Sequence, residues 1–206
     1  MFILRDSLPD LKGKIRFIHA VPNTPSVDIY GNGTLLASNC KFGDLTDYVE
    51  LAPLEYLIEI YPTGTYDTPI FTENLTLLPG NALTVSIVTN NSRLSLFKLK
   101  DSASKAATNI SFLRFIHLSP NAPLISLSTK NGEMLFNQVE YLETTGYYPL
   151  SPGSYNFVLS LSGANAINKT ISNLPITPGE FQTIYVLGLL NGEPQLGFLL
   201  SKDGRQ

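Results

Sequence analysis

The sequence has little charge, a single cysteine and no long apolar run, and each of these shortages excludes a class of protein. Charged residues make up 15% of the 206 residues and the net charge is −3, so the strongly basic surface that grips nucleic acid is missing. Cys40 has no partner in the chain, which excludes a disulfide scaffold. Hydrophobic residues still make up 43%, which suffices for a packed core and argues against intrinsic disorder.

The apolar segments are too short for a membrane span or a secretory leader. The longest candidate, Ile184 to Leu190, contains Gly188, whereas a span needs about 20 residues. At the start only Phe2 to Leu4 is apolar before Arg5, and a leader needs roughly 7–15 apolar residues. We therefore expect synthesis in the cytosol, no membrane insertion, and a final place either in the cytoplasm or, by assembly inside a cell, on a spore or cell surface.

Recognisable catalytic and cofactor motifs are also missing. The sequence has no Gly-x-Ser-x-Gly elbow, no phosphate-binding loop, no His-Glu-x-x-His pair and no dinucleotide fingerprint. Its two histidines, His19 and His117, have no further His, Cys or carboxylate at a spacing typical of metal ligands. We therefore predict a protein that is not an enzyme and has no catalytic, cofactor-binding or metal-binding residues.

The sequence does contain a duplication. Residues 15–25 read IRFIHAVPNTP and residues 113–123 read LRFIHLSPNAP, and the match continues as far as Pro-Gly at 79 and 178. The unit is too long for a solenoid repeat, so a whole domain is present twice. We predict an N-terminal arm at 1–12, a first repeat at 13–100, a linker at 101–109, and a second repeat with a short C-terminal tail at 110–206.

Each repeat has the pattern of an all-β domain. In 83–89, Leu83, Val85 and Ile87 alternate with Thr84 and Ser86, as in a strand with one buried face. Asn-Gly and Pro-Gly pairs separate such runs, and one helical turn is expected near 44–47. About seven short strands in a repeat of about 90 residues predict an immunoglobulin-like or transthyretin-like β-sandwich. In the first repeat they are expected near 14–20, 26–30, 34–38, 54–61, 70–77, 82–89 and 93–99.

The motif shared by both repeats consists of Arg16, Phe17, His19, Pro22 and Pro25, and of Arg114, Phe115, His117, Pro120 and Pro123. Val27, Asp28, Tyr30, Asn32 and Gly33 follow it in the first repeat. This pattern resembles a known bacterial family, the domain of unknown function numbered 4397. The second repeat departs from the family pattern at Ser126 and Ser128, where the family has Asp and Tyr. The resemblance implies surface-associated sandwich modules, often in tandem, with no assigned catalysis.

Three groups of residues allow both a structural and a functional interpretation. The histidines are expected to end core strands and to bind a neighbouring loop carbonyl, although a role as metal ligands or general bases is the alternative. The acidic residues of the first repeat, with Asp44 and Asp47 the closest approach to a calcium loop, read as a solvated face, and docking of a partner stays open. Tyr61 and Tyr66 are candidates for stacking on sugars or anchoring a partner, against an ordinary role at the sheet rim.

The N-terminal arm is the last candidate for function. Phe2, Ile3 and Leu4 either fold back on their own domain or add as a strand to the open sheet edge of a neighbouring subunit. We therefore expect a non-catalytic structural or protein-interaction module of a bacterial surface layer, such as a spore coat or appendage, with protein partners or self-association. Carbohydrate or small-ligand binding is the alternative. An enzyme ranks third, because it would need a pocket that joins a histidine to carboxylates.

Overall fold

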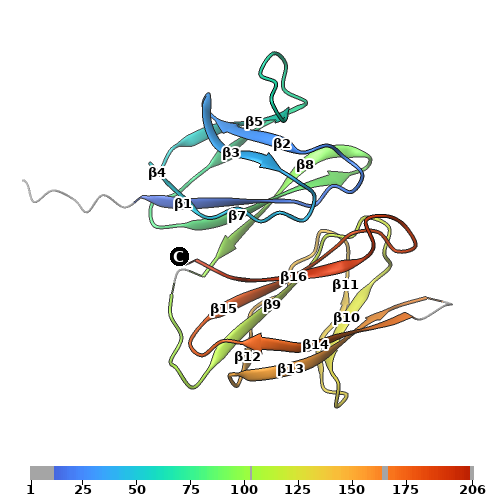
Figure 1. The fold of residues 1–206 in the computed structure, drawn as a ribbon. Helices are drawn as coiled ribbons and strands as arrows, with labels where there is room; N and C mark the ends of the chain where they lie inside the picture. The colour runs from blue at the N-terminus through green and yellow to red at the C-terminus, as the bar shows by residue number, and fades with distance from the viewer. Residues whose placement is uncertain (1–11, 103, 164–166, 205–206) are drawn as a thin grey trace, which may run out of the picture.

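The computed structural model describes residues 12–102, 104–163 and 167–204, which form two β-sandwiches stacked on each other (Figure 1). The first half contains β1 (Gly13–His19), β2 (Val27–Gly31), β3 (Thr34–Cys40), β4 (Val49–Leu51), β5 (Glu55–Pro62), β6 (Phe71–Thr76), β7 (Ala82–Asn90) and β8 (Arg93–Asp101). The second half contains β9 (Ser111–His117), β10 (Ile125–Thr129), β11 (Met134–Val139), β12 (Tyr148–Leu150), β13 (Gly153–Leu161), β14 (Ile167–Ile176), β15 (Phe181–Leu187) and β16 (Gly197–Lys202).

The prediction of two tandem all-β sandwiches is confirmed, and two of its details are wrong. Each half has eight described strands instead of seven, because β4 and β12 span three residues each and show too little alternation to be recognised. The helical turn expected near 44–47 is absent. In its place Leu45 forms an isolated bridge with Ile18, and no helix occurs among the described residues.

The two halves have the same topology. In the first half a sheet of order β4-β1-β7-β8 faces a sheet of order β3-β2-β5-β6, and the second half repeats these orders as β12-β9-β15-β16 and β11-β10-β13-β14. The central pairs β1–β7 and β9–β15 are parallel, and the other strand pairs are antiparallel. The structure therefore repeats the duplication seen in the sequence.

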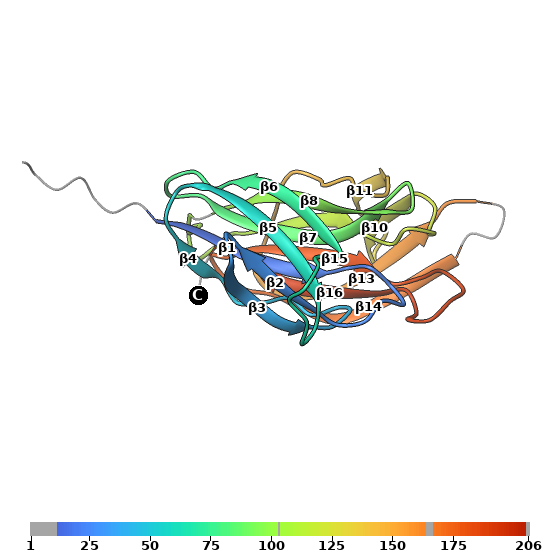
Figure 2. The ribbon, with the colours of Figure 1, turned by 90° about the horizontal axis from the view of Figure 1, so that it is seen from above.

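Alternation along β1 and β9 explains how the halves fold and how they meet. Phe17 and Phe115 point into the cores of their own sandwiches. Ile18 and Ile116, the next residues along each strand, point the opposite way and join a third buried cluster that draws on both halves. That cluster lies where β4-β1-β7-β8 meets β12-β9-β15-β16 (Figures 1 and 2). Each inner sheet is thus buried on both faces, and each outer sheet leaves one face to solvent.

Candidate functional site: the interface between the halves and the outer tyrosine cluster

The motif arginine of the first half reaches across the interface. Arg16 lies on β1 between Ile15 and Phe17, whose side chains face the first core. Its own side chain therefore points the other way, between the two inner sheets, and is 3% exposed. Its Nε donates to Thr84 Oγ1 of its own half at 2.7 Å. Its terminal nitrogens donate to the second half, at 2.7 Å to Asp203 Oδ1 and at 2.8 Å to the Lys202 carbonyl.

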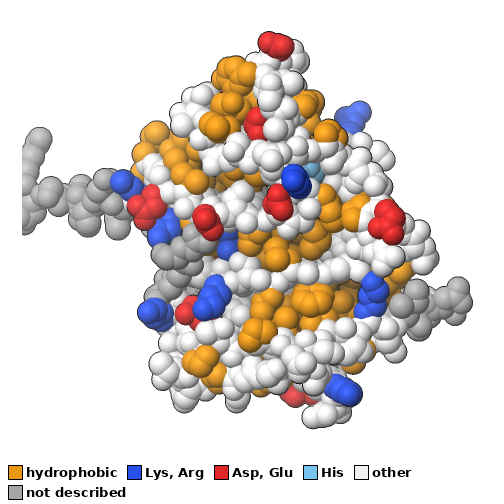
Figure 3. Space-filling model, viewed as in Figure 1, with side chains coloured by type: hydrophobic (Ala, Val, Ile, Leu, Met, Phe, Trp, Pro, Cys, Tyr) orange, Lys and Arg blue, Asp and Glu red, His pale blue; other side chains and the backbone are white. Residues whose placement is uncertain are grey.

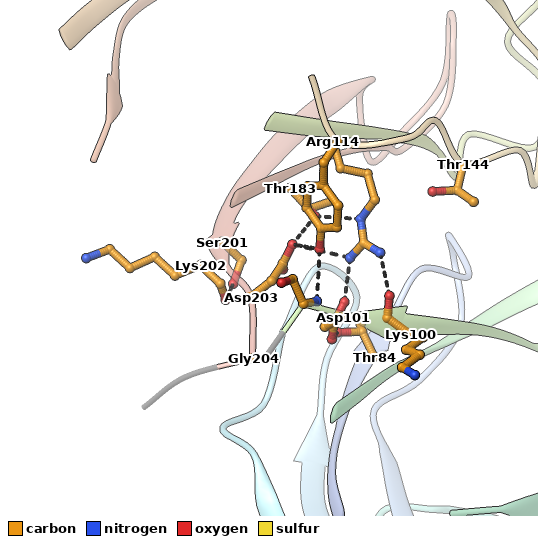
Figure 4. A network of polar contacts seen from close by, with 12 residues as sticks. Thr84, Lys100, Asp101, Arg114, Thr144, Thr183, Ser201, Lys202, Asp203 and Gly204 are labelled. Atoms are coloured by element: carbon orange, nitrogen blue, oxygen red, sulfur yellow. Dashed lines mark hydrogen bonds and ion pairs between the residues drawn. The ribbon is translucent and has the colours of Figure 1, made fainter. Parts of the chain in front are cut away.

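Arg114 makes the reciprocal contacts from the second half (Figure 4). Its Nε donates to Thr183 Oγ1 at 2.9 Å, and Thr183 corresponds to Thr84. Its terminal nitrogens donate to the Lys100 carbonyl at 3.0 Å and to Asp101 Oδ1, both in the first half. Each arginine is therefore held by a threonine of its own half and by a carboxylate of the other half.

Two tyrosines complete this arrangement, which we call the arginine–aspartate network (Arg16, Arg114, Asp101, Asp203, Tyr48 and Tyr147). The Tyr48 hydroxyl donates to Asp101 Oδ2 at 2.6 Å, and the Tyr147 hydroxyl donates to Asp203 Oδ2 at 2.7 Å. The guanidinium carbon of Arg16 lies 4.4 Å from the ring centre of Tyr48, and that of Arg114 lies 4.7 Å from Tyr147. Both tyrosine hydroxyls also accept an amide hydrogen from the opposite half, which ties the strand ends together.

Burial and the neighbouring groups together shift the pKa values of this network. Burial acts to lower the pKa of each arginine, but the neighbouring tyrosines and aspartates outweigh it, so both arginine pKa values are raised and both side chains stay charged. Burial raises the pKa of Asp203 despite its arginine neighbours. Burial also raises the pKa of Tyr185, whose hydroxyl lies 3.4 Å from Arg16 Nη2, to about 12. The network thus keeps two charged arginines buried beside the side chains of Asp101 and Asp203.

The motif histidines are the last residues of β1 and β9, and they are buried against the turns that follow these strands. His19 Nε2 lies 3.4 Å from the Pro25 carbonyl, and its Nδ1 accepts the Val21 amide hydrogen at 3.3 Å. His117 repeats this with the Pro123 carbonyl at 3.1 Å. Burial lowers the pKa of both histidines, and the carbonyl contacts oppose that shift only in part. Each imidazole therefore holds the turn that contains Pro22 or Pro120.

Among the described residues, no group of three His, Cys, Asp or Glu side chains lies close enough together to hold a metal ion. Cys40 is buried in the first core, and burial raises the pKa of its thiol to about 11. A hollow of about 490 Å³ lies beside the β15–β16 connection. Its lining includes Lys169 and Glu193, and neither histidine borders it. In the first half the corresponding connection is a tight turn from Asn90 to Arg93.

The departure from the family pattern at Ser126 preserves one backbone contact. Asp28 accepts the amide hydrogens of Asn39 at 2.7 Å and of Gly64 at 2.9 Å. Burial acts to raise its pKa, but these backbone bonds outweigh it and the pKa is lowered. Ser126 Oγ accepts the corresponding amide hydrogen of Gln138 at 2.9 Å. Both Asn39 and Gln138 have a positive φ at an irregular point of strand pairing, so an acceptor is needed there in either half.

The tyrosines divide into those that both halves share and those that they do not. Tyr56 donates its hydroxyl hydrogen to the Ala52 carbonyl, and Tyr155 donates to the Ser151 carbonyl, each at 2.9 Å. These two contacts have the four-residue reach of a tyrosine corner. Their occurrence in both halves indicates a role in the fold.

A second set of tyrosines occurs only in the first half. Tyr30, Tyr61 and Tyr66 lie on the outer side of the β3-β2-β5-β6 sheet, with ring centres 4.7–5.4 Å apart. Tyr61 is buried and Tyr66, from the β5–β6 loop, is 53% exposed. Strand pairing places Ser128 and Ser160 at the positions of Tyr30 and Tyr61 in the second half. The second sandwich therefore folds without these rings.

Comparison with known sequences decides the family. A sequence model described as "Domain of unknown function (DUF4397)" matches residues 13–128. The chain belongs to this family. The match spans all eight strands of the first half and continues through β9 into β10. No curated protein matches the sequence.

Two solved structures have a distant similarity to this DUF4397 protein. The Bacillus anthracis TIE protein matches with 8% identity and a TM-score of 0.28, over 86% of this chain. The chain spans only 34% of the length of TIE. The Eubacterium rectale Amy13K module CBMbc, of family CBM26 and solved with maltoheptaose, matches with 12% identity and a TM-score of 0.25, over 93% of this chain and 97% of that one.

Two aspartates of the DUF4397 chain were not recognised as site residues in the sequence. The sequence places Asp101 in the linker, but it is the last residue of β8 and is 2% exposed. The sequence places Asp203 in the C-terminal tail, but it follows β16 directly and is 1% exposed. A Lys-Asp pair closes the last strand of both repeats, and that repetition was the available signal. The other candidates, Phe2, Ile3 and Leu4, lie outside the described residues.

Proposed function

We propose that this protein is a non-catalytic structural or protein-interaction module of a bacterial surface layer, such as a spore coat or an appendage. One observation carries the proposal: the motif residues that could do chemistry are used in both halves to hold the fold and join the sandwiches. Arg16 and Arg114 are bonded across the interface, and His19 and His117 are bonded to turn carbonyls. We further propose that the second half is a second DUF4397 copy, on the strength of its repeated motif and strand order.

Assembly of the module is proposed to use the N-terminal arm, which would add to an open sheet edge of a neighbouring subunit. The test compares the intact chain, a chain that lacks residues 1–12, and a full-length variant with Phe2, Ile3 and Leu4 changed to Ser. Masses in solution and negative-stain electron microscopy are recorded for all three. Regular polymers from the intact chain alone support the proposal. Monomers in all three samples contradict assembly through the arm.

Carbohydrate or small-ligand binding is the second candidate function, and the outer tyrosines favour it, because aromatic rings stack on sugar faces. The test is calorimetry of the intact chain with a panel of soluble oligosaccharides, followed by the same titrations on Tyr66→Ala. Heat that is lost with the variant supports sugar binding at this place. A panel without a response counts against it.

A further inference from the structure

Two sheets with the same topology carry opposite charges in the two halves. The strands of the β3-β2-β5-β6 sheet contain four carboxylates, Asp28, Glu55, Glu59 and Glu73, and no Lys or Arg. The corresponding strands of the second half contain Lys169 and no carboxylate. A charge that the fold required would be expected in both halves. The acidic character of this outer sheet is therefore a property of the first half that folding alone does not explain.

Some of these carboxylates are already engaged, and others are free to meet a partner. Asp28 is held by two backbone amides, and Glu73 pairs with Lys98 at 2.5 Å. Glu59 Oε1 accepts only the Tyr61 hydroxyl, at 3.1 Å, and forms no salt bridge with any described residue. Asp67 is exposed on the β5–β6 loop and likewise forms no salt bridge within the described chain. Within the described part of the chain, Glu59 and Asp67 thus remain unneutralised, as does the exposed Glu55 at the start of β5.

These acids lie beside the unshared tyrosines. Strand pairing puts Glu59 directly opposite Tyr30, and Tyr61 follows Glu59 by two residues on the same strand face. We call this surface the tyrosine face and define it as Tyr30, Glu59, Tyr61, Tyr66 and Asp67. Figure 3 shows acidic and hydrophobic side chains next to each other at the top of the first half, where the β5–β6 loop lies.

Exposed apolar side chains surround the tyrosine face. Leu35 is 49% exposed, Leu57 42% and Ile70 48%. Leu35 pairs with Tyr30 on the neighbouring strand, so it shares the same side of the sheet. An aliphatic chain that ends in a positive charge would satisfy both components, because its stem covers apolar surface and its head meets rings and carboxylates. Lys and Arg have this construction.

We infer that the tyrosine face docks a segment of a partner protein that carries Lys or Arg, with the cation over Tyr66 and beside Glu59 and Asp67. The inference rests on the proposed protein-interaction function and names its surface and partner chemistry. A sugar fits less well, because Tyr66 is the one strongly exposed ring of the three and the ring planes are inclined by 34–80° instead of forming a platform.

The test uses the full ¹⁵N-labelled chain and a defined probe. The peptide acetyl-Arg-Leu-Arg-Leu-Arg-Leu-amide is titrated, and amide shifts are followed, with acetyl-Gln-Leu-Gln-Leu-Gln-Leu-amide as the neutral control. We expect shifts confined to 28–35 and 57–72 with the basic peptide and much smaller ones with the neutral peptide. A rise in salt from 50 to 300 mM should weaken binding several-fold, since exposed charges are screened.

Variants separate the tyrosine face from general acidity. Tyr66→Ala is expected to weaken peptide binding about 10-fold or more, as for an aromatic anchor. Glu59→Gln is expected to weaken it about 3- to 10-fold and to reduce the salt dependence. Met134→Ala is the matched control, because Met134 pairs with Ser128 as Leu35 pairs with Tyr30 and is 51% exposed. Unchanged amide shifts elsewhere show that each variant is folded.

Each remaining outcome overturns the inference. Equal binding of both peptides, equal shifts in the second half, or full binding by Tyr66→Ala and Glu59→Gln would show that the face does not select a cation. Shifts of the same residues with a maltooligosaccharide, but not with the basic peptide, would make it a sugar site. The arm experiment reports separately on the proposed function, because its readout is polymer formation and involves no residue of the tyrosine face.

Discussion

Replacement of Asp101 by Asn should destabilise the whole protein, although it changes one atom. The Asp101 side chain is fully buried, and it accepts hydrogen bonds from Tyr48 at 2.6 Å, from Thr84 at 2.5 Å and from Arg114. Asn has a similar volume but carries no charge, and its amide nitrogen donates. The buried network would then hold two arginines and one carboxylate, and Arg114 would keep the Lys100 carbonyl but lose its negatively charged partner in the other half.

The size of the loss follows from the missing negative charge, since the two arginines would share Asp203, which lies 3.3 Å from Arg114 Nη2. Removal of one partner from a buried ion pair costs about 3–5 kcal/mol, which is a large share of a typical unfolding free energy of about 5–15 kcal/mol. At about 2.1 cal/mol/K per residue, the 206 residues have an unfolding entropy near 0.43 kcal/mol/K. The melting temperature should therefore fall by about 7–12 °C.

Urea unfolding followed by circular dichroism measures this loss, with Glu50→Gln as the control. Glu50 pairs with Lys14 at 3.4 Å on the surface, where its side chain is 55% exposed, so its loss should cost less than about 1 kcal/mol. In a double-mutant cycle, Arg114→Met should recover part of the loss, because it leaves Arg16 alone with the remaining carboxylate of Asp203. A loss below about 1 kcal/mol for Asp101→Asn, or one equal to the control, would refute the view that this network joins the halves.

Three further predictions concern single buried groups. Burial lowers the pKa of His117 from its usual 6.5, so the unfolded chain takes up more protons below that value and stability falls as pH drops from 7 to 5.5. This loss is at most about 1.4 kcal/mol per pH unit, and His117→Gln should flatten the profile of urea midpoints. Asp28→Ser should cost only about 1–2 kcal/mol, since a Ser at position 28 can accept the Asn39 amide hydrogen as Ser126 accepts that of Gln138, and only the bond from Gly64 is lost. Asp28→Leu should cost more in the same assay, because it removes both acceptors. Ser86→Ala should raise stability by about 1 kcal/mol in thermal melts, because Ser86 Oγ is buried with no hydrogen-bond partner among the described residues; a clear loss would contradict this.

The sequence predicts the sandwiches well because strand alternation and turn residues are local signals. Leu83, Val85 and Ile87 do face the first core, as their alternation indicated. The same alternation predicts that Thr84 and Ser86 face solvent, yet both are fully buried. Alternation shows that two faces differ in polarity, but it cannot show that a second sandwich covers the polar face.

The candidate site was less predictable, because its partners are far apart in the chain. Arg16 was recognised as a motif residue, but nothing local connects it to Asp203, which lies 187 residues away. Tyr61 and Tyr66 were identified as candidates from residue type alone. The role of Tyr30 beside them became visible only when strand pairing placed it opposite Glu59 and showed Ser128 at the equivalent position.

The two arginine–aspartate contacts differ in the time that passes between the synthesis of their two partners. Arg114 is made 13 residues after its partner Asp101, so both leave the ribosome almost together. Arg16 precedes Asp203 by 187 residues, which corresponds to roughly 10–40 s at ordinary rates of translation. During that interval the inner sheet of the first sandwich is uncovered, with apolar side chains such as Ile18 beside Arg16, whose carboxylate neighbour in its own half is Asp101 at 3.9 Å. The contact between Arg16 and Asp203 can therefore form only after both repeats have been synthesised and folded. In a nascent or truncated chain that lacks Asp203, Arg16 has no carboxylate of the second half to bind.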